Sequence, residues 1–263
     1  MRTNDKAVSA IEMGLPTIEE QQEIAELLQH IGNLISLNQK EHDKLVTTKQ
    51  AMLQKMFPKP GRDVPEVRFG GFEGTWELLP FSKFAVKHVE KNAGLSVTET
   101  FTNSATQGIV SQLDYFDNNV SNDESIGGYF IVEPDYYVYN PRISATAPVG
   151  PIKRNKLGRV GVMSPLYLVF SVDGLDHDYL DYFFETDTWH PYMKLNGDSG
   201  ARSDRFSIKD AVFFAMPIPV PSKIEQQAIG SFFTNLDQLI SLKSQELDKL
   251  KQVKSALLQK MFV

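Results

Sequence analysis

PTIEEQQEIAELLQHIGNLISLNQKEHDKLVTTKQAMLQKMF (residues 16–57) recurs as PSKIEQQAIGSFFTNLDQLISLKSQELDKLKQVKSALLQKMF (residues 221–262) near the end of the chain. The two copies align without a gap at a constant offset of 205, and twenty of the 42 positions are identical. An internal repeat of this kind constrains the architecture more strongly than any single motif. We therefore predict two like helices with one globular insert between them.

Each copy opens with a helix-start signal. A hydroxyl residue is followed three positions later by glutamate, as Thr17 and Glu20 in the first copy and Ser222 and Glu225 in the second. This pattern predicts a capping box, in which hydroxyl and carboxylate each bond an orphan backbone N–H. Neither copy contains an internal proline, and Pro58 ends the first. About 38 helical residues at ~1.5 Å rise predict a rod of roughly 57 Å.

Apolar residues recur at heptad-like spacing in both copies, and a few polar residues interrupt them. The interruptions, which we expect to fix the register of pairing at some cost in stability, are Asn38, His42, Lys49, Lys243 and Lys254. Because the insert joins the end of one helix to the start of the other, we predict antiparallel pairing within the chain. The alternative, two unrelated surface helices, does not account for the repeat.

The insert, residues 58–220, alternates strand-like and helix-like runs. Short runs of β-branched and aromatic residues predict strands at residues 129–132, 136–139, 160–163 and 166–172. Amphipathic runs predict helices at residues 179–184 and 189–195. Ser207 is expected to cap a last short helix. About 160 residues are ample for an independent core. The predicted fold class is α+β, with this globule inserted between two long helices that form an antiparallel coiled coil.

A short alternating segment precedes each helix. Met216, Ile218 and Val220 alternate with other residues before the second copy and predict a strand leading into the helix. Ile11 and Met13 show the same alternation before the first copy. We therefore interpret residues 1–15 as the remnant of another insert.

The composition excludes several classes of protein. The chain has no cysteine, which excludes disulfides and Cys-ligated zinc and suits a reducing compartment. No stretch is long and apolar enough for a membrane helix, and the first residues do not resemble a signal peptide. We expect a cytoplasmic protein without a membrane partner. The net charge of −6 argues mildly against nucleic acid, yet residues 136–172 contain five basic residues and no acidic one.

Signatures of catalysis are missing from the sequence. It contains no GxxxxGK[ST] loop, and its five histidines show no HExxH spacing, so we expect neither nucleotide nor metal to bind. Asn140-Pro141 is similar to the start of an NPP[FY] box of amino-methyltransferases, but Arg142 stands where the second proline belongs. A single-chain methyltransferase would have to bind S-adenosylmethionine by itself. The sequence therefore predicts a protein that is not an enzyme.

Ordered motifs along the insert carry a resemblance to a known family. They are PEVRF at 65–69, FEGTW at 72–76, YNPR at 139–142, Ser164-Pro165 with Tyr167, and GAR at 200–202, continuing through PIPVP at 217–221 to EQQ at 225–227. Together with the repeat, they resemble the target recognition domain and conserved helices in specificity subunits of type I restriction-modification systems. Such subunits usually carry two recognition domains, whereas this chain has one complete domain. The resemblance therefore implies a half-length or truncated form.

The resemblance implies a division into residues 1–15, helix 16–57, recognition domain 58–220 and helix 221–263. It also implies a non-catalytic subunit that reads one half-site of double-stranded DNA, through the major groove, and docks methyltransferase subunits. A restriction subunit and a second copy of the chain are further partners that fit. S-adenosylmethionine and ATP would belong to those partner subunits, and this chain would need no cofactor. The alternative is a coiled-coil adaptor or decoy that binds the methyltransferase without reading DNA.

Candidate DNA contacts were chosen by side-chain chemistry, because base edges are read by Arg, Lys, Asn and Gln, and phosphates also accept from hydroxyls. The basic candidates are Arg142, Lys153, Arg154, Lys156, Arg159, Lys194, Arg202 and Arg205. The polar candidates are Asn103, Ser104, Thr106, Gln107 and Ser203. Plain solvation is the competing interpretation for each basic residue. Arg142 and Arg202 have a second competing role as ion-pair partners of Asp198 and Asp204.

A pair of glutamines lies in the first turn of each predicted helix. These residues are Gln21, Gln22, Gln226 and Gln227. The resemblance implies a docking surface for a methyltransferase subunit at these positions. Local hydrogen bonding at the junction of helix and globule is the competing interpretation.

Overall fold

The computed structural model describes residues 16–115, 126–198 and 204–261. Its contacts divide the chain into two compact units. The helical unit comprises Met1–Thr48 and Leu236–Val263, and the globular unit comprises Lys49–Asn235. Both long helices cross this division, so one end of each helix belongs to the globular unit.

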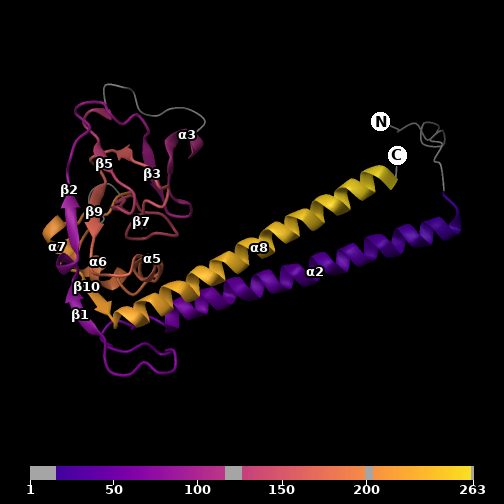
Figure 1. Cartoon of the computed structure of the whole chain (residues 1–263), viewed down its shortest axis with the longest axis horizontal. Coiled ribbons are helices and arrows are strands. Elements are labelled where there is room, and N and C mark those ends of the chain that lie inside the picture. The colour runs from indigo at the N-terminus through magenta and orange to yellow at the C-terminus, as the bar shows by residue number, and fades with distance from the viewer. Residues whose placement is uncertain (1–15, 116–125, 199–203, 262–263) are drawn as a thin grey trace, which may run out of the picture. The chain divides into compact units, whose positions relative to one another are not determined.

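The two long helices are α2 (Ile18–Lys55) and α8 (Lys223–Met261), which confirms the helices predicted from the repeat. Within the helical unit they run side by side in opposite directions (Figure 1). Lys243 of α8 donates its Nζ to Asn38 Oδ1 at 2.9 Å. A Cβ on Gly32, earlier on α2, would lie 3.8 Å from Nζ of Lys254, later on α8. Contacts therefore advance along one helix as they retreat along the other.

The contact between Asn38 and Lys243 joins equivalent positions of the repeat, because the two residues are 205 apart. Lys243 also forms ion pairs with Glu41 at 2.8 Å and Glu246 at 3.0 Å, and those glutamates are equivalent to each other as well. Hydrogen bonding to Glu41 raises the pKa of Lys243. Asn38 is buried and donates its Nδ2 to the carbonyl of Leu34. Of the predicted polar interruptions, Asn38 and Lys243 thus lie where the two copies face each other, whereas Lys49 pairs with Glu185 of the globular unit.

The helix caps are only half of the predicted capping boxes. Thr17 Oγ1 accepts the N–H of Glu20, and Ser222 Oγ accepts the N–H of Glu225, both at 3.3 Å. The prediction is wrong for the second carboxylate, because Glu225 instead accepts from Arg68 Nε at 2.6 Å and Nη2 at 2.8 Å. A guanidinium offers two charged donors to one carboxylate, so it competes well with a single backbone N–H.

The described residues of the globular unit form four antiparallel sheets. The largest has strand order β2-β9-β6-β7, and the others pair β1 with β10, β3 with β4 and β5 with β8. The strands are β1 (Glu77–Pro80), β2 (Ala85–His88), β3 (Phe101–Ser104), β4 (Gly108–Ser111), β5 (Phe130–Val132), β6 (Tyr137–Tyr139), β7 (Ile152–Arg154), β8 (Gly161–Met163), β9 (Leu168–Val172) and β10 (Pro217–Val220).

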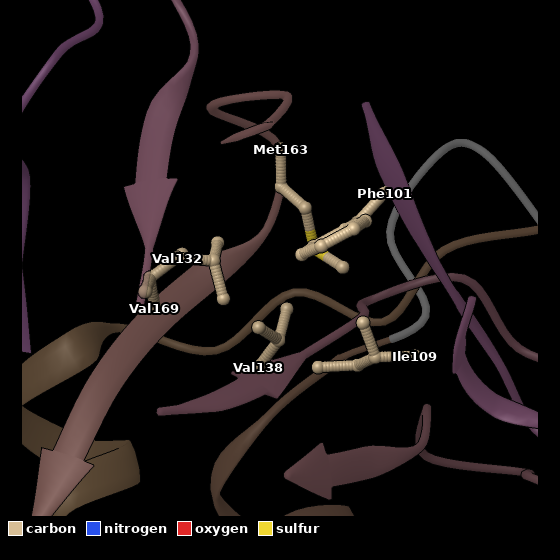
Figure 2. Close-up of a cluster of buried hydrophobic side chains, with 6 residues drawn as sticks. All are labelled: Phe101, Ile109, Val132, Val138, Met163 and Val169. Carbon is tan, nitrogen blue, oxygen red and sulfur yellow. The ribbon is translucent and has the colours of Figure 1, made fainter. Parts of the chain in front are cut away.

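One cluster of buried side chains joins three of these sheets. Six strands each contribute one residue, and the cluster consists of Phe101, Ile109, Val132, Val138, Met163 and Val169 (Figure 2). Gly161 is required beside it, because a Cβ there would lie 2.2 Å from the ring of Phe101. Interdigitation at this density leaves no room for an added methyl group. The β3–β4 and β6–β7 hairpins are thus held by a shared core.

A second, aromatic core lies under α5 (His177–Glu185). Phe57, just after α2, packs against Tyr179, Phe183 and Phe233 with ring centroids 5.4–6.1 Å apart. The short helices complete the unit; they are η1 (Phe81–Lys83), α3 (Gln112–Tyr115), α6 (His190–Asn196) and α7 (Asp210–Phe214). Aromatic packing therefore fixes the C-terminal end of α2 and the N-terminal end of α8, which are the two helix ends that belong to this unit.

Several predicted elements are confirmed within a few residues, namely β5, β6, β8, β9, β10, α5 and α6. The predicted cap at Ser207 is wrong. The backbone of Ser207 pairs with Asp198 instead, and α7 begins at Asp210 after Lys209 without a side-chain cap. The predicted remnant at residues 1–15 lies outside the described residues. In the described ranges, no helix is both long and apolar enough to cross a membrane.

Candidate nucleic-acid interface

Arg154 is the most enclosed of the predicted basic residues. Its guanidinium contacts Asp181 at 2.8 Å, Asp178 at 2.5 Å and Asp135 at 3.1 Å, and its side chain is 12% exposed. Burial opposes the charge of Arg154, but the carboxylates, Asp181 foremost, outweigh it and raise the pKa of Arg154. The arginine thereby ties the end of β7 to α5. Its charge is largely neutralised before any ligand arrives.

Lys156 and Arg159 are also paired, but at the surface. Lys156 Nζ lies 2.7 Å from Asp181, and Arg159 donates to both carboxylate oxygens of Glu99 at 2.7 Å. The hydrogen bond from Arg159 lowers the pKa of Glu99. About half of each basic side chain remains exposed, at 59% and 48%. Exposed pairs of this kind are weak, so a phosphate could replace the carboxylate.

Four basic candidates form no ion pair with any part of the chain that the structure describes. They are Arg142, Lys153, Lys194 and Arg205. The carboxylates of Asp198 and Asp204 therefore do not pair with Arg142. The backbone carbonyl of Asp204 accepts the N–H of Ile143, the residue after Arg142. Arg202 and Ser203 lie outside the described residues. The charges of these four residues are neutralised by no carboxylate among the described residues.

The polar candidates follow β3 into its turn. Asn103 is buried and donates its Nδ2 to the carbonyl of Val138 at 2.7 Å, and Ser104 Oγ accepts the N–H of Gln107. These two side chains shape the turn from inside. Thr106 and Gln107 are exposed at its tip. The turn therefore offers two side chains to a ligand and uses two for its own structure.

Two clefts of the globular unit bring several candidates together. The larger has a volume of about 530 Å³ and is lined by Thr106, Thr146, Lys153 and His190, among others. The smaller, about 210 Å³, is lined by Thr106, Gln107, Lys153 and Lys156. Burial lowers the pKa of His190, which favours its neutral form at the larger cleft. The β3–β4 turn and the end of β7 thus form one polar surface.

Arg142 and Arg205 form a second site, which the sequence did not indicate. They are directly opposite each other in an isolated antiparallel bridge. Arg205 also lines a cleft of about 370 Å³ with Tyr139, Tyr167 and Ser207. In the sequence, Arg142 lies within a family-like motif and Arg205 follows another, and 63 positions separate them. Pairing at that separation is decided by tertiary structure.

The four glutamines behave differently from one another. Gln226 is 3% exposed, accepts the N–H of Asp176 at 2.8 Å and donates to the carbonyl of Pro221 at 3.0 Å. Gln21 makes only the equivalent local bond, to the carbonyl of Pro16 at 2.8 Å, and is exposed. Gln22 and Gln227 are exposed as well. Three of the four carboxamides are therefore accessible to a partner.

Comparison with known proteins connects this fold to a family. Residues 163–252, from β8 through most of α8, match the family model described as the type I restriction modification DNA specificity domain. In this region the chain is similar to type I restriction-modification specificity subunits. This matches the resemblance that the sequence motifs indicated.

Two curated specificity subunits, both from Methanocaldococcus jannaschii, align with nearly the whole chain. The type I restriction enzyme MjaVIII specificity subunit is 22% identical over 277 residues, which cover 96% of this chain and 61% of that protein. The putative type I restriction enzyme MjaX specificity subunit is 23% identical over 273 residues, which cover 97% and 59%. The chain thus spans about 60% of the length of these relatives.

Two solved structures share the fold. The HsdS subunit from Thermoanaerobacter tengcongensis superposes with a TM-score of 0.57 at 17% identity, over 94% of this chain and 59% of that one. A chain from a structure on the complex assembly and conformational transition of the type I R-M system gives a TM-score of 0.55 at 15% identity, over 99% and 63%. At these low identities, the similarity to the two structures concerns the fold alone.

Proposed function

We propose that this chain is a non-catalytic DNA-recognition subunit of a type I restriction-modification methyltransferase and endonuclease. The specificity-domain match over residues 163–252 is the observation that carries the proposal. In this proposal, residues 58–220 are a target recognition domain that reads one half-site of double-stranded DNA through the major groove. A cytoplasmic location remains a prediction from the sequence.

The surface proposed to face DNA is built from four candidates of the globular unit. Thr106, Gln107, Lys153 and Lys156 line the two polar clefts. Gln and Lys can read base edges, and Thr can donate to phosphate. Asn103 and Ser104 hold the β3–β4 turn that carries Thr106 and Gln107 before DNA arrives, which limits the entropy lost on binding. Arg159 and Lys194 stay candidates for phosphate contact. The proposed role of Arg154 is to hold the end of β7 against α5.

The long helices are proposed to form an antiparallel coiled coil that sets the spacing between half-sites and docks the methyltransferase subunits. The contact of Asn38 with Lys243 supports the pairing, and the exposed Gln21, Gln22 and Gln227 are candidates for docking. S-adenosylmethionine and ATP would be bound by partner subunits. A restriction subunit and a second copy of the chain complete the proposed set of partners.

Methylome sequencing of cells that express the chain with its cognate methyltransferase tests the proposal. We expect methylation at a motif that is absent when the chain is omitted. A bipartite palindrome would indicate two copies acting together, and a motif with one defined half would indicate that a single globule suffices. A stable complex without methylation would contradict DNA recognition by this chain.

A second candidate function is an adaptor or decoy that binds the methyltransferase but not DNA. The acidic net charge of −6 and the pairing of Arg154, Lys156 and Arg159 with carboxylates favour it. The salt dependence of duplex binding separates the two candidates. DNA recognition predicts affinity that falls steeply with salt as counterions are released from phosphates, whereas a decoy has no such contacts.

A further inference from the structure

Arg142 and Arg205 face each other across a short two-stranded ribbon. The N–H of Ile143 donates to the carbonyl of Asp204 at 3.0 Å, and the N–H of Phe206 donates to the carbonyl of Pro141 at 2.8 Å. These bonds flank the Arg142–Arg205 bridge, which makes it a non-hydrogen-bonded pair. In such a pair the Cα atoms lie about 4.5 Å apart and both side chains project from the same face. We call these two residues the arginine pair.

Like charges directly opposite each other destabilise a ribbon. Three other guanidinium groups of the globular unit have carboxylate partners: Arg68 has Glu225, Arg154 has Asp181 and Arg159 has Glu99. In the described residues, no carboxylate pairs with either member of the arginine pair. The intervening residues 199–203 contain no Asp or Glu in the sequence either. Within the described residues and the segment 199–203, two adjacent cations therefore have no carboxylate partner.

The backbone under the arginine pair is held firmly. Asn140 Oδ1 accepts the N–H of Arg142 at 2.9 Å, and Asn140 Nδ2 donates to the carbonyl of Asn103 at 2.9 Å. Gly150 lets this strand approach closely, because a Cβ there would lie 2.1 Å from the Asn140 carbonyl oxygen. The buried ring of Phe206 anchors the opposite strand beside Arg205. The two charges are therefore kept adjacent, and the chain cannot easily separate them.

We propose that the arginine pair clamps one phosphate group of the DNA backbone between its two guanidinium groups. This inference rests on the proposed function and assigns a phosphate contact to a named site. A phosphate accepts parallel N–H bonds from a guanidinium and neutralises the repulsion that the pair otherwise suffers. The neighbouring cleft of about 370 Å³, which Pro141 and Arg205 line, leaves open space beside both strands.

The test is the salt dependence of duplex binding by the full chain, alone and with its methyltransferase subunits. The variant is Arg142→Gln combined with Arg205→Gln. The matched control is Lys83→Gln combined with Lys209→Gln, which removes the same charge from exposed residues of the globular unit outside the proposed DNA surface. The slope of log K against log salt is negative. One shared phosphate predicts that the magnitude of this slope decreases by about 0.9 in the variant and stays unchanged in the control.

Three outcomes would overturn the clamp. A fall of about 1.8 would mean two separate phosphates. An unchanged slope, in a wild-type chain that does bind duplex, would mean no contact at this site and would leave the proposed function standing. Loss of binding to inorganic phosphate alone, with duplex affinity unchanged, would assign the pair to a free phosphate. By contrast, a wild-type complex that binds no duplex would contradict the proposed function itself.

The melting temperature of the DNA-free chain distinguishes the clamp from a merely structural role of Arg205, because the two predict changes in opposite directions. The clamp predicts that Arg205→Gln leaves the melting temperature of the DNA-free chain unchanged or raises it at low salt, because a like-charge contact is removed. A lower melting temperature would indicate that Arg205 supports the fold and would overturn the proposal. Arg205→Lys, which keeps the charge, should retain most of the salt slope.

Discussion

The start of α2 and the start of α8 carry the same sequence pattern in different surroundings. At α8, Glu225 and Gln226 are 1% and 3% exposed, and Phe233 is fully buried. At α2, the equivalent Glu20 and Gln21 are exposed, and Leu28 is half-buried. The difference lies in what the rest of the chain supplies. Around α8 the globular unit provides Arg68, the N–H of Asp176 and the ring of Phe57, each of which contacts one of these residues.

What the two starts share is local. Both caps place a hydroxyl oxygen 3.3 Å from the N–H three residues later. Both glutamines reach back to a proline carbonyl, at 2.8 Å for Gln21 and 3.0 Å for Gln226. The repeat therefore encodes a helix start that forms in either setting. Tertiary contacts then bury the start of α8. We call its buried residues Glu225, Gln226 and Phe233 the buried joint.

Truncating the largest side chain of this joint should separate the two starts most clearly. Phe233→Ala should lower the free energy of unfolding by about 3–5 kcal/mol, because it opens a cavity beside Phe57 and Tyr182. Leu28→Ala should lower it by about 1 kcal/mol or less. Urea unfolding followed by far-UV circular dichroism measures this, because both units contain helix and contribute to the signal. Equal losses would mean that the start of α2 is packed in solution as α8 is.

Removing the glutamate charge is expected to have the next largest effect. Glu225→Gln leaves Arg68, which is 18% exposed, without its carboxylate and should cost about 2 kcal/mol. The loss stays below that of a fully buried pair because Arg68 keeps its bonds to the carbonyls of Glu73 and Gly74. Glu20→Gln should change stability by less than about 0.5 kcal/mol. The same unfolding experiment applies, and a neutral Glu225→Gln would contradict the buried joint.

The glutamines should differ by a smaller amount. Gln226→Ala removes the acceptor for the N–H of Asp176, the N-cap residue of α5, and should cost about 1–2 kcal/mol. Gln21→Ala loses one exposed local bond and should cost less than about 0.5 kcal/mol. Hydrogen exchange at the amide of Asp176 provides a direct check. Protection that survives in Gln226→Ala would show that the carboxamide is not its partner in solution.

The two caps should respond alike to mutation, because this part of the helix start is the same in both copies. Thr17→Ala and Ser222→Ala should each weaken the first turn by about 0.5–1 kcal/mol, because both remove the same side-chain acceptor. Amide exchange of Glu20 and Glu225 measures the local opening in each variant. A large effect at only one helix would mean that the shared local pattern is not what starts both helices.

Residue pattern predicted the regular parts of the globular unit better than its irregular ones. β6 and β9 were predicted because they are runs of β-branched and aromatic residues, and both are central in the largest sheet. β1 and β3 were missed. Glu77–Pro80 is mostly exposed, and Phe101–Ser104 has three polar residues that are nonetheless buried. Short strands at sheet edges or in turns lack the alternation on which such predictions depend.

The candidate site divides in the same way. Residue type identified Arg154 and Arg142 equally, because both are arginines in a stretch without acidic residues. Folding then placed Asp135, Asp178 and Asp181 around Arg154 and placed Arg205 opposite Arg142. Sequence could not separate a neutralised arginine from an available one, because the relevant carboxylates are 19–27 positions away from Arg154.

The sequence by itself determined the two helices and the hydroxyl half of each cap, and it predicted the opposed direction of the helices that the contact of Asn38 with Lys243 agrees with. These features depend on contacts within a few residues and on a repeat whose equivalent positions face each other. Only the tertiary structure decided which glutamate is buried against Arg68 and which arginines remain unpaired. Burial and charge pairing depend on groups that are distant along the chain and adjacent in space, so the folded core had to form before either was fixed.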